Sequence, residues 1–269
     1  MKELKGKVVA LTGAGSGIGR GVAMAMMRQG ATLAIADINE VGLNETAAMI
    51  AEAGGKVSAT ILDVSNSADI SQWASNIISQ HGQADVVINN AGVTLAATGS
   101  DQSHDDLAWV MDVNFWGVVH GTRAFLPHFL ERNSGHIVNI SSIFGLFGVA
   151  GQSAYCASKF AVRGYSDSIR VELDKSNVNM TVVHPGGIRT NIVNSVRFRL
   201  QGDEAPSKGE FIAKANKLLA RTEPDDAGEQ IVKAIQRNKA RLLIGRDAKY
   251  IDIMQRLMPA RFPLMGAEN

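Results

Sequence analysis

The stretch Thr12-Gly-Ala-Gly-Ser-Gly-Ile-Gly19 places four glycines between an apolar run that begins at Lys7 and a helical pattern carried by Val22, Ala23 and Met26. Glycine permits positive φ angles and leaves no Cβ between the backbone and a ligand. The helix after the turn offers free N–H groups and the positive end of its dipole. A turn with these properties is suited to a pyrophosphate.

The spacing of these glycines is T-G-x-x-x-G-x-G. The strict G-x-G-x-x-G fingerprint is absent, because Arg20 stands where its third glycine would fall. Taken alone, a glycine-rich turn after a strand is also compatible with a purely structural tight turn. The end of the second predicted strand helps to decide between the two interpretations.

Asp37 ends the second predicted strand, 18 residues beyond Gly19. A carboxylate at this place can accept both hydroxyls of an adenine ribose, although an aspartate can also simply open a turn before the next helix. A 2′-phosphate would meet a like charge there, and the neighbouring Ser16, Ile38 and Asn39 offer no cation. We therefore expect NAD as the cofactor, with Arg20 on the first helical turn pointing away from the ribose.

Short apolar runs alternate with longer helical patterns along the whole chain. Helical spacing is seen, for example, in Ala227, Ile231 and Ile235. The seven predicted strands are Lys7 to Leu11, Thr32 to Ala36, Val57 to Leu62, Val86 to Ile88, His136 to Ile140, Met180 to Val183 and Leu242 to Ile244. Because the runs are apolar throughout, they predict strands buried on both faces. The fold class is α/β, a Rossmann-type doubly wound parallel sheet with helices on both faces.

Composition narrows the classes of partner and compartment. Of the 269 residues 45% are hydrophobic and 20% are charged, and the net charge of +1 gives no bulk attraction to nucleic acid or anionic membrane. The single cysteine, Cys156, cannot close an intramolecular disulfide, and a zinc ribbon is excluded, so we expect no metal. With no signal-peptide pattern and no run long enough to span a bilayer, the sequence predicts a cytoplasmic protein.

No linker divides the chain, so residues 1–269 are expected to form one dinucleotide-binding and catalytic domain. Residues 186–222 are expected to contain a substrate lid, because the stretch from Gly186 to Lys208 lacks strand or strong helical periodicity. Residues 246–269 form a C-terminal extension, in which helical spacing stops at Pro259 and Phe262 to Met265 continue the apolar character. This tail could cap the pocket, touch a membrane or pack between subunits.

Tyr155-Cys-Ala-Ser-Lys159 places a phenol and an ammonium at i and i+4, hence on one face of a helix. Tyrosine is a poor base near neutral pH, but a fixed neighbouring cation stabilises its phenolate and lowers its pKa. Ser141 and Ser142 come directly after the predicted strand that ends at Ile140. A Tyr-x-x-x-Lys pair alone is common by chance.

Together these motifs resemble the short-chain dehydrogenase/reductase family, in its short single-domain branch, from about Lys7 to Ile244. The resemblance is carried, in the family's order, by Thr12-Gly-x-x-x-Gly-x-Gly19, Asn89-Asn-Ala-Gly92, Asn114, Ser142 thirteen residues before Tyr155, and Pro185-Gly186 with Thr190. The family implies Tyr155 as general acid/base, Ser142 as a hydrogen-bond donor to the substrate oxygen, and Lys159 as the group that binds the nicotinamide ribose and depresses the Tyr155 pKa. Asn114 would anchor a proton-relaying water, or as a helix-interior amide would merely satisfy backbone groups.

The resemblance also implies a set of cofactor contacts. Asp63 and Val64 would border the adenine, Asn90 to Gly92 its ribose, and Pro185 to Thr190 the nicotinamide. The full predicted set is Gly13, Ser16, Gly17, Ile18, Gly19, Asp37, Asp63, Val64, Asn90, Ala91, Gly92, Tyr155, Lys159, Pro185, Gly186, Ile188 and Thr190.

Apolar residues around the catalytic pair, Ile143 to Ala150 with Val93 and Ile188, predict a lipophilic alcohol or ketone of the steroid, retinoid or fatty type. The same residues could instead pack against helices or a second subunit. Arg197 and Arg199 keep open an anionic or acyl-thioester substrate. One alternative function is an NADP-dependent carbonyl or acyl-thioester reductase. A non-catalytic dinucleotide-binding regulator is the other alternative, while the glycine spacing disfavours a nucleotide-sugar epimerase. Family resemblance implies a homodimer or homotetramer.

Overall fold

Strands and helices alternate along the chain in the computed structural model, which describes residues 1–202, 205–219 and 222–261. In chain order the elements are β1 (Val8–Thr12), α1 (Gly17–Arg28), β2 (Thr32–Asp37), α2 (Glu40–Glu52), β3 (Lys56–Ile61), α3 (Ser67–His81), β4 (Val86–Asn89), β5 (Leu95–Ala96), α4 (His104–Met111), a π-helix η1 (Asp112–Trp116), α5 (Gly117–Glu131), β6 (Gly135–Ile140), η2 (Ile143–Gly145), α6 (Ser153–Glu172), η3 (Leu173–Lys175), β7 (Val178–Pro185), β8 (Arg197–Phe198), α7 (Lys208–Leu219), α8 (Pro224–Gln236), β9 (Arg241–Ile244) and α9 (Arg246–Leu257).

Seven strands form one parallel sheet in the order β3-β2-β1-β4-β6-β7-β9, which confirms the predicted doubly wound fold. From β1 the chain first adds strands towards one edge and then, from β4, towards the other edge. The reversal leaves a crevice at the carboxyl ends of β1 and β4, where open α/β sheets bind their ligands.

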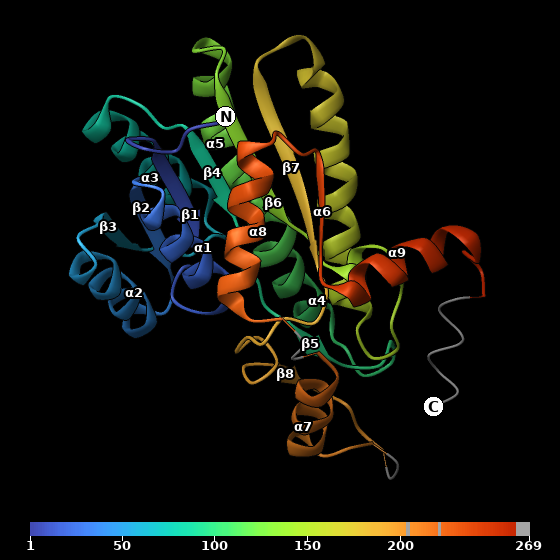
Figure 1. The fold of residues 1–269 in the computed structure, drawn as a ribbon. Helices are drawn as coiled ribbons and strands as arrows, with labels where there is room; N and C mark the ends of the chain where they lie inside the picture. The colour runs from blue at the N-terminus through green and yellow to red at the C-terminus, as the bar shows by residue number, and fades with distance from the viewer. Residues whose placement is uncertain (203–204, 220–221, 262–269) are drawn as a thin grey trace.

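Helices cover both faces of this sheet (Figure 1). Alternate residues of β1 enter opposite cores: Val9 and Leu11 pack with α1 and α8, whereas Val8 and Ala10 pack with α3 and α5. This division follows from the period of two along a strand. The prediction that the strands are buried on both faces is therefore confirmed for β1. No helix in the described ranges is long and apolar enough to cross a membrane.

Two features of the strands were not predicted. β3 lies at the sheet edge and is largely exposed, so the expectation of burial on both faces is wrong for this strand. Its polar Lys56, Ser58 and Thr60 suit an edge position, where one side of the strand has no neighbour. In addition, β5 and β8 pair parallel in a small second sheet below the main one, and β8 lies inside the stretch that was expected to lack strands.

Two histidines are buried in neighbouring strands, His136 in β6 and His184 in β7. Thr181 donates its hydroxyl proton to the Lys239 carbonyl, so His136 Nε2 must donate to Thr181 Oγ1 at 2.8 Å. The other ring nitrogen of His136 has no partner. Desolvation lowers the pKa of His136 to about 3 and that of His184 to about 4. Both rings are therefore neutral in the folded protein.

Acid is expected to destabilise the protein through these two rings. Because the unfolded chain binds their protons more tightly, the stabilisation is full above pH about 6.5 and is lost as the pH falls towards about 4 and 3. Between pH 7 and pH 5 each ring should cost about 2 kcal/mol of unfolding free energy. Urea unfolding of wild type and His136→Gln checks this, since glutamine can donate to Thr181 without titrating. An identical pH slope in the variant would contradict the assignment.

Candidate active site

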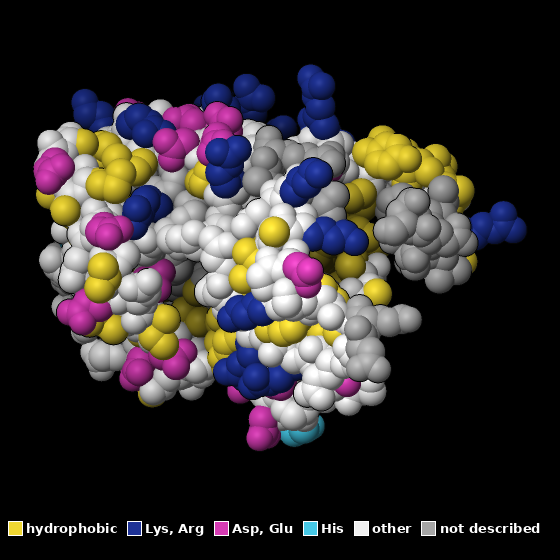
Figure 2. All heavy atoms as spheres, turned by 90° about the horizontal axis from the view of Figure 1, so that it is seen from below, with side chains coloured by type: hydrophobic (Ala, Val, Ile, Leu, Met, Phe, Trp, Pro, Cys, Tyr) yellow, Lys and Arg dark blue, Asp and Glu magenta, His cyan; other side chains and the backbone are white. Residues whose placement is uncertain are grey.

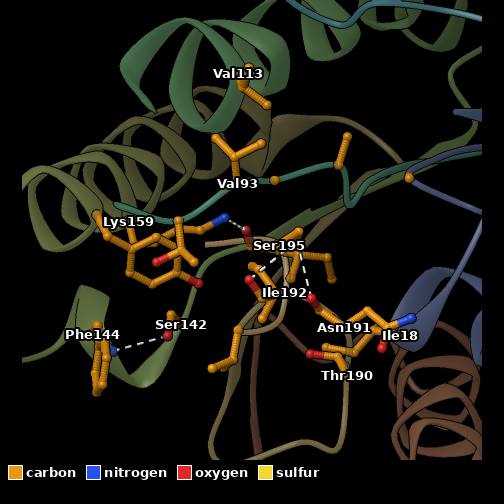
Figure 3. A pocket seen from close by; sticks show the side chains of 18 of the residues that line it. Ile18, Val93, Val113, Ser142, Phe144, Lys159, Thr190, Asn191, Ile192 and Ser195 are labelled. Atoms are coloured by element: carbon orange, nitrogen blue, oxygen red, sulfur yellow. Dashed lines mark hydrogen bonds between the residues drawn. The ribbon is translucent and has the colours of Figure 1, made fainter. Parts of the chain in front are cut away.

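A cavity of about 1300 Å³ opens at the carboxyl ends of the central strands. Its floor is the glycine-rich turn and the strand ends, and its outer walls come from α4, the loop after β6, the segment after β7 and α7. Figure 2 shows the face of the molecule seen from below, where hydrophobic side chains lie in a hollow. In Figure 3, Ser142 and Lys159 lie at one end, Ile18 and Thr190 at the other, and Val93 between them.

Most of the residues predicted for the site meet in this one cavity. The predicted residues that line it are Gly13, Ser16, Gly17, Ile18, Asp37, Asp63, Val64, Asn90, Ala91, Gly92, Ser142, Tyr155, Lys159, Pro185, Gly186, Ile188 and Thr190. Gly19 and Asn114 are not among the lining residues. Chain segments separated by more than half the sequence are thus brought together by the reversal of strand order.

Gly19 packs closely against the turn, and its contact with the cofactor stays a prediction. A Cβ at this position would collide with the carbonyl of Gly13, which needs its own positive φ of 68°. Asn90 holds the same turn, because its Nδ2 donates to the carbonyls of Thr12 and Gly13 at 3.0 and 2.9 Å. Glycine is therefore needed at position 19 because the first turn of the helix packs closely on the backbone of Gly13.

The first turn of α1 has the chemistry of an anion cradle. Ser16 is its N-cap residue and makes no side-chain capping bond, so it satisfies none of the N–H groups of the first turn. Ser16, Gly17 and Ile18 line the cavity. These donors and the helix dipole fit the pyrophosphate of a dinucleotide.

Asp37 faces the same turn from the end of β2. Its Oδ2 accepts from Gly15 N at 2.8 Å and its Oδ1 from Asn39 N at 2.9 Å. An ionised carboxylate has about four acceptor sites, so both oxygens can accept further hydroxyl groups.

The nearby guanidinium of Arg20 is engaged with other partners through its Nε and Nη2. Its Nη2 donates to Gly15 O and to Glu45 Oε2 at 2.6 and 2.8 Å, and its Nε donates to Thr46 Oγ1 at 2.9 Å. Arg20 is also absent from the residues that line the cavity. The orientation expected for Arg20, away from the cofactor end of the cavity, agrees with these contacts.

The predicted acid/base group consists of Tyr155 and Lys159 on α6 and Ser142 after β6. Lys159 Nζ lies 5.6 Å from the centre of the Tyr155 ring and donates to Ile140 O at 3.1 Å. The Phe144 ring meets the Tyr155 ring edge to face with centroids 6.1 Å apart. The i, i+4 spacing on a helix produces the Tyr–Lys pair, as expected.

The pKa of Tyr155 departs from the expectation for the protein without ligand. Desolvation raises this pKa to about 12, although the hydrogen bond with Ser142 acts to lower it. Desolvation also lowers the pKa of Lys159 to about 8, which weakens the cation that was expected to stabilise the phenolate. Burial therefore outweighs the charge of the lysine in this structure.

The two adjacent serines have different partners. Ser141 donates its hydroxyl proton to the backbone carbonyl of Lys159 at 2.8 Å. Ser142 instead accepts from Phe144 N at 3.1 Å, and its hydroxyl forms a hydrogen bond with Tyr155. This difference supports Ser142, the residue selected by its spacing to Tyr155.

Asn114 lies in the π-helix η1 and is completely buried. Its Oδ1 accepts from Val93 N at 2.8 Å, while its Nδ2 donates to Val93 O at 3.0 Å and to Ser158 Oγ at 3.1 Å. The side chain thus fixes the loop after β4 against α6, which agrees with the alternative role as an amide that satisfies backbone groups. Water anchoring by this residue stays a prediction.

Asp247 on α9 was missed by the sequence reasoning. Its Oδ2 accepts from Gly187 N at 2.7 Å, and its carboxylate fills the space where a Cβ of Gly186 would lie. The turn after Pro185 is therefore held from a helix that lies 60 residues later in the chain. No local sequence signal could have revealed this contact, because it depends on how β9 and α9 close the fold.

The outer part of the cavity is mainly apolar. Trp109 and Ala108 from α4, Phe144 and Val149 from the loop after β6, and Phe211 from α7 all line it. Val93 and Ile188, which were predicted to line the pocket, do so as well.

The two arginines that had suggested an anionic substrate are not among the lining residues. Arg197 and Arg199 both pair with Asp106, at 2.9 and 3.2 Å.

Comparison with known proteins agrees with this geometry. The short chain dehydrogenase family model matches residues 7–200. The protein named "Putative oxidoreductase SadH" of Mycobacterium tuberculosis is 38% identical over 99% of this chain and 96% of its own length. Epidermal retinol dehydrogenase 2 of Homo sapiens is 33% identical over 99% of this chain and 83% of its own length.

A solved structure has the same architecture. A short chain dehydrogenase/reductase from Burkholderia phymatum, crystallised in complex with NAD, superposes with a TM-score of 0.88 at 29% identity and covers 98% of this chain and 97% of its own. The seven-stranded sheet, the cavity at its carboxyl edge and the extent of the matches lead to one conclusion: this oxidoreductase chain belongs to the short-chain dehydrogenase family.

Proposed function

We propose that this protein is an NAD(H)-dependent oxidoreductase that interconverts a lipophilic secondary alcohol and the corresponding ketone or aldehyde. The observation that carries the proposal is the single cavity, which holds Asp37 and the glycine-rich turn at one end and Ser142, Tyr155 and Lys159 beside an apolar wall at the other. A cofactor and a substrate bound in this cavity would meet at the acid/base group.

The described residues fit a nicotinamide dinucleotide. The free N–H groups of the α1 first turn would bind the pyrophosphate, Asp37 the adenine ribose, and Lys159 the nicotinamide ribose. Lys159 has three N–H donors and uses one of them on Ile140, so two remain. The segment from Pro185 to Thr190, fixed by Asp247, would hold the nicotinamide. When bound, this cofactor would accept a hydride from the alcohol or return one to the carbonyl.

Specificity for NAD rests on the charges around the ribose site. Asp37 would repel a 2′-phosphate, and Arg20 is occupied by Glu45, Thr46 and the carbonyl of Gly15. The cation that an NADP site would need is therefore not offered by the side chains next to Asp37. The solved relative from Burkholderia phymatum also contains NAD.

Proton transfer would proceed through Tyr155. In alcohol oxidation its phenolate oxygen takes the hydroxyl proton of the substrate, and in carbonyl reduction the phenol returns this proton. Ser142, which is hydrogen-bonded to Tyr155 in the protein without ligand, would donate its hydroxyl proton to the substrate oxygen and so fix that oxygen next to Tyr155. Lys159 stabilises the phenolate when both groups carry their charges.

An uncharged, lipophilic substrate is supported by the lining of the cavity. Apart from Asp37 and Asp63, which are assigned to the cofactor, the acidic lining residues Asp105, Asp112 and Glu210 outnumber the basic Lys159 and Lys214. An anionic substrate would face this excess of negative charge, and the pairing of Arg197 and Arg199 with Asp106 removes the argument for an acyl-thioester. The name of the human relative, a retinol dehydrogenase, points in the same direction.

A non-catalytic regulator is disfavoured, because Ser142, Tyr155 and Lys159 are all present and adjacent. We further propose that residues 186–222 act as the substrate lid and that residues 246–269 extend the single domain. In the extension, α9 covers the predicted helical spacing, whereas Phe262 to Met265 lie outside the described residues. A homodimer or homotetramer is proposed from family membership, and a cytoplasmic location from the sequence.

The rate of alcohol oxidation is expected to rise with pH. Since the pKa of Tyr155 is raised to about 12, the reactive phenolate is the minor form near neutrality, and its fraction grows about tenfold per pH unit. The rise should flatten above about pH 8, where Lys159 loses the charge that supports the phenolate. A kcat/KM profile for oxidation measures this, and an acidic optimum would contradict it.

The cofactor assignment is tested by titrating the purified protein with NADH and with NADPH while following the fluorescence of the reduced nicotinamide. We expect tight NADH binding and much weaker NADPH binding. Equal affinities would contradict the Asp37 assignment, and no binding of either would contradict the proposed function as a whole.

A further inference from the structure

The two-residue strand β8 lies between α4 and α7, below the main sheet (Figure 1). It is tied to β5 by backbone bonds from Arg197 N to Thr94 O at 3.1 Å and from Arg199 N to Ala96 O at 2.8 Å. Side chains alternate across a strand, so Arg197 and Arg199 share one side and Phe198 takes the other. The three residues can therefore contact two different walls of the cavity.

On the first side, four residues form what we name the Asp106 clamp: Asp106 and Trp109 on α4, with Arg197 and Arg199. Asp106 is 4% exposed, and each of its oxygens accepts from one arginine, at 2.9 and 3.2 Å. The Arg197 guanidinium also lies 3.7 Å from the centre of the Trp109 ring. Trp109 lines the cavity, so the clamp fixes an aromatic wall of the substrate end.

On the second side, the Phe198 ring meets the Phe211 ring of α7 edge to face, with centroids 5.7 Å apart. Phe211 also lines the cavity. β8 therefore joins the α4 wall, through the clamp, to the α7 wall, through Phe198. The carboxylate of Asp106 is the group that holds this connection on the α4 side.

We propose that Asp106 is a positioning residue that sets the width of the substrate end of the cavity. Through Arg197 and Arg199 it fixes Trp109 relative to Phe211, and so selects uncharged alcohols and ketones by the size of their apolar body. This inference rests on the proposed function and deepens it. Loss of the clamp should relax size selection and leave the cofactor end unchanged.

The test compares Asp106→Asn with a matched control, Asp252→Asn. Asp252 also joins two arginines, Arg241 at 2.6 Å and Arg256 at 3.3 Å, and does not line the cavity. Initial rates with NAD are measured for straight-chain secondary alcohols of increasing length. The ratio of kcat/KM between the best and the shortest alcohol should fall about tenfold or more in Asp106→Asn. It should stay at the wild-type value in Asp252→Asn, and NADH affinity should be unchanged in both variants.

A second readout does not depend on activity. Trypsin cleaves after arginine in segments that can leave their folded conformation. Arg197 and Arg199 are already partly exposed, and loss of the clamp should release their backbone from the fold. Mass spectrometry of a limited digest should therefore detect faster cleavage after them in Asp106→Asn only. If Asp106→Asn fails to fold, Trp109→Phe is tested in its place. This variant should change the selectivity ratio, while tryptic cleavage after Arg197 and Arg199 should proceed at the wild-type rate.

The inference is overturned if Asp106→Asn keeps both the wild-type ratio of kcat/KM values and the wild-type rate of tryptic cleavage. It is also overturned if a folded Trp109→Phe keeps the wild-type ratio of kcat/KM values. Absence of NAD-linked turnover in the wild type would instead refute the proposed function, while the digest would still decide whether the clamp exists.

Discussion

Replacing Tyr155 with phenylalanine is expected to lower kcat by about a thousandfold, because the substitution removes the only group proposed to exchange a proton with the substrate oxygen. The rest of the site should stay in place. The Tyr155 ring packs edge to face against Phe144, and Lys159 keeps its bond to Ile140. NADH affinity, measured by fluorescence titration, should therefore stay within about twofold of the wild-type value.

Tyr165→Phe is the matched control for this variant. Tyr165 lies on the same helix, α6, packs edge to face with Phe115 at 6.1 Å, and is not among the residues that line the cavity. It should retain full activity. A Tyr155→Phe enzyme with a rate within tenfold of wild type would mean that the substrate proton takes another route.

Replacing Asp37 with asparagine is expected to reduce the preference for NAD over NADP by about a hundredfold. Two hydrogen bonds from ribose hydroxyls to a charged acceptor contribute about 3 kcal/mol, and a factor of ten corresponds to about 1.4 kcal/mol. Removal of the charge also ends the repulsion of a 2′-phosphate. Asparagine keeps an acceptor for Gly15 N, so the turn itself should survive.

The ratio of kcat/KM with NAD to that with NADP measures this effect. Asp63→Asn is its control, because Asp63 also lines the cavity but is predicted to border the adenine, which both cofactors share. It should weaken both cofactors equally. An unchanged ratio in Asp37→Asn would mean that the ribose contact is assigned to the wrong residue.

The sequence was sufficient for the features that depend on local pattern. Apolar runs separated by helical spacing predicted all seven strands of the main sheet, and the glycine turn with Asp37 predicted the cavity end at β1 and β2. The spacing between Ser142 and Tyr155 selected the serine that is hydrogen-bonded to Tyr155. These features arise from the periods of strand and helix and from the chemistry of single residues.

Features that depend on packing between distant segments could not be predicted in this way. The pairing of β5 with β8, the contact of Asp247 with Gly187 and the clamp on Asp106 each join residues with no local pattern. The raised pKa of Tyr155 has the same origin, since burial is a property of the fold and not of the Tyr-x-x-x-Lys spacing. Arg197 consequently looked available to a substrate although it is engaged by Asp106.

The most direct test of the central claim is the absorbance of reduced nicotinamide in a mixture of the purified protein, NAD and a panel of secondary alcohols that runs from short aliphatics to steroids and retinoids. We predict formation of NADH with lipophilic alcohols, little with short ones and much less with NADP. Measurable NAD binding without turnover of any alcohol, or turnover that requires NADP, would contradict the account.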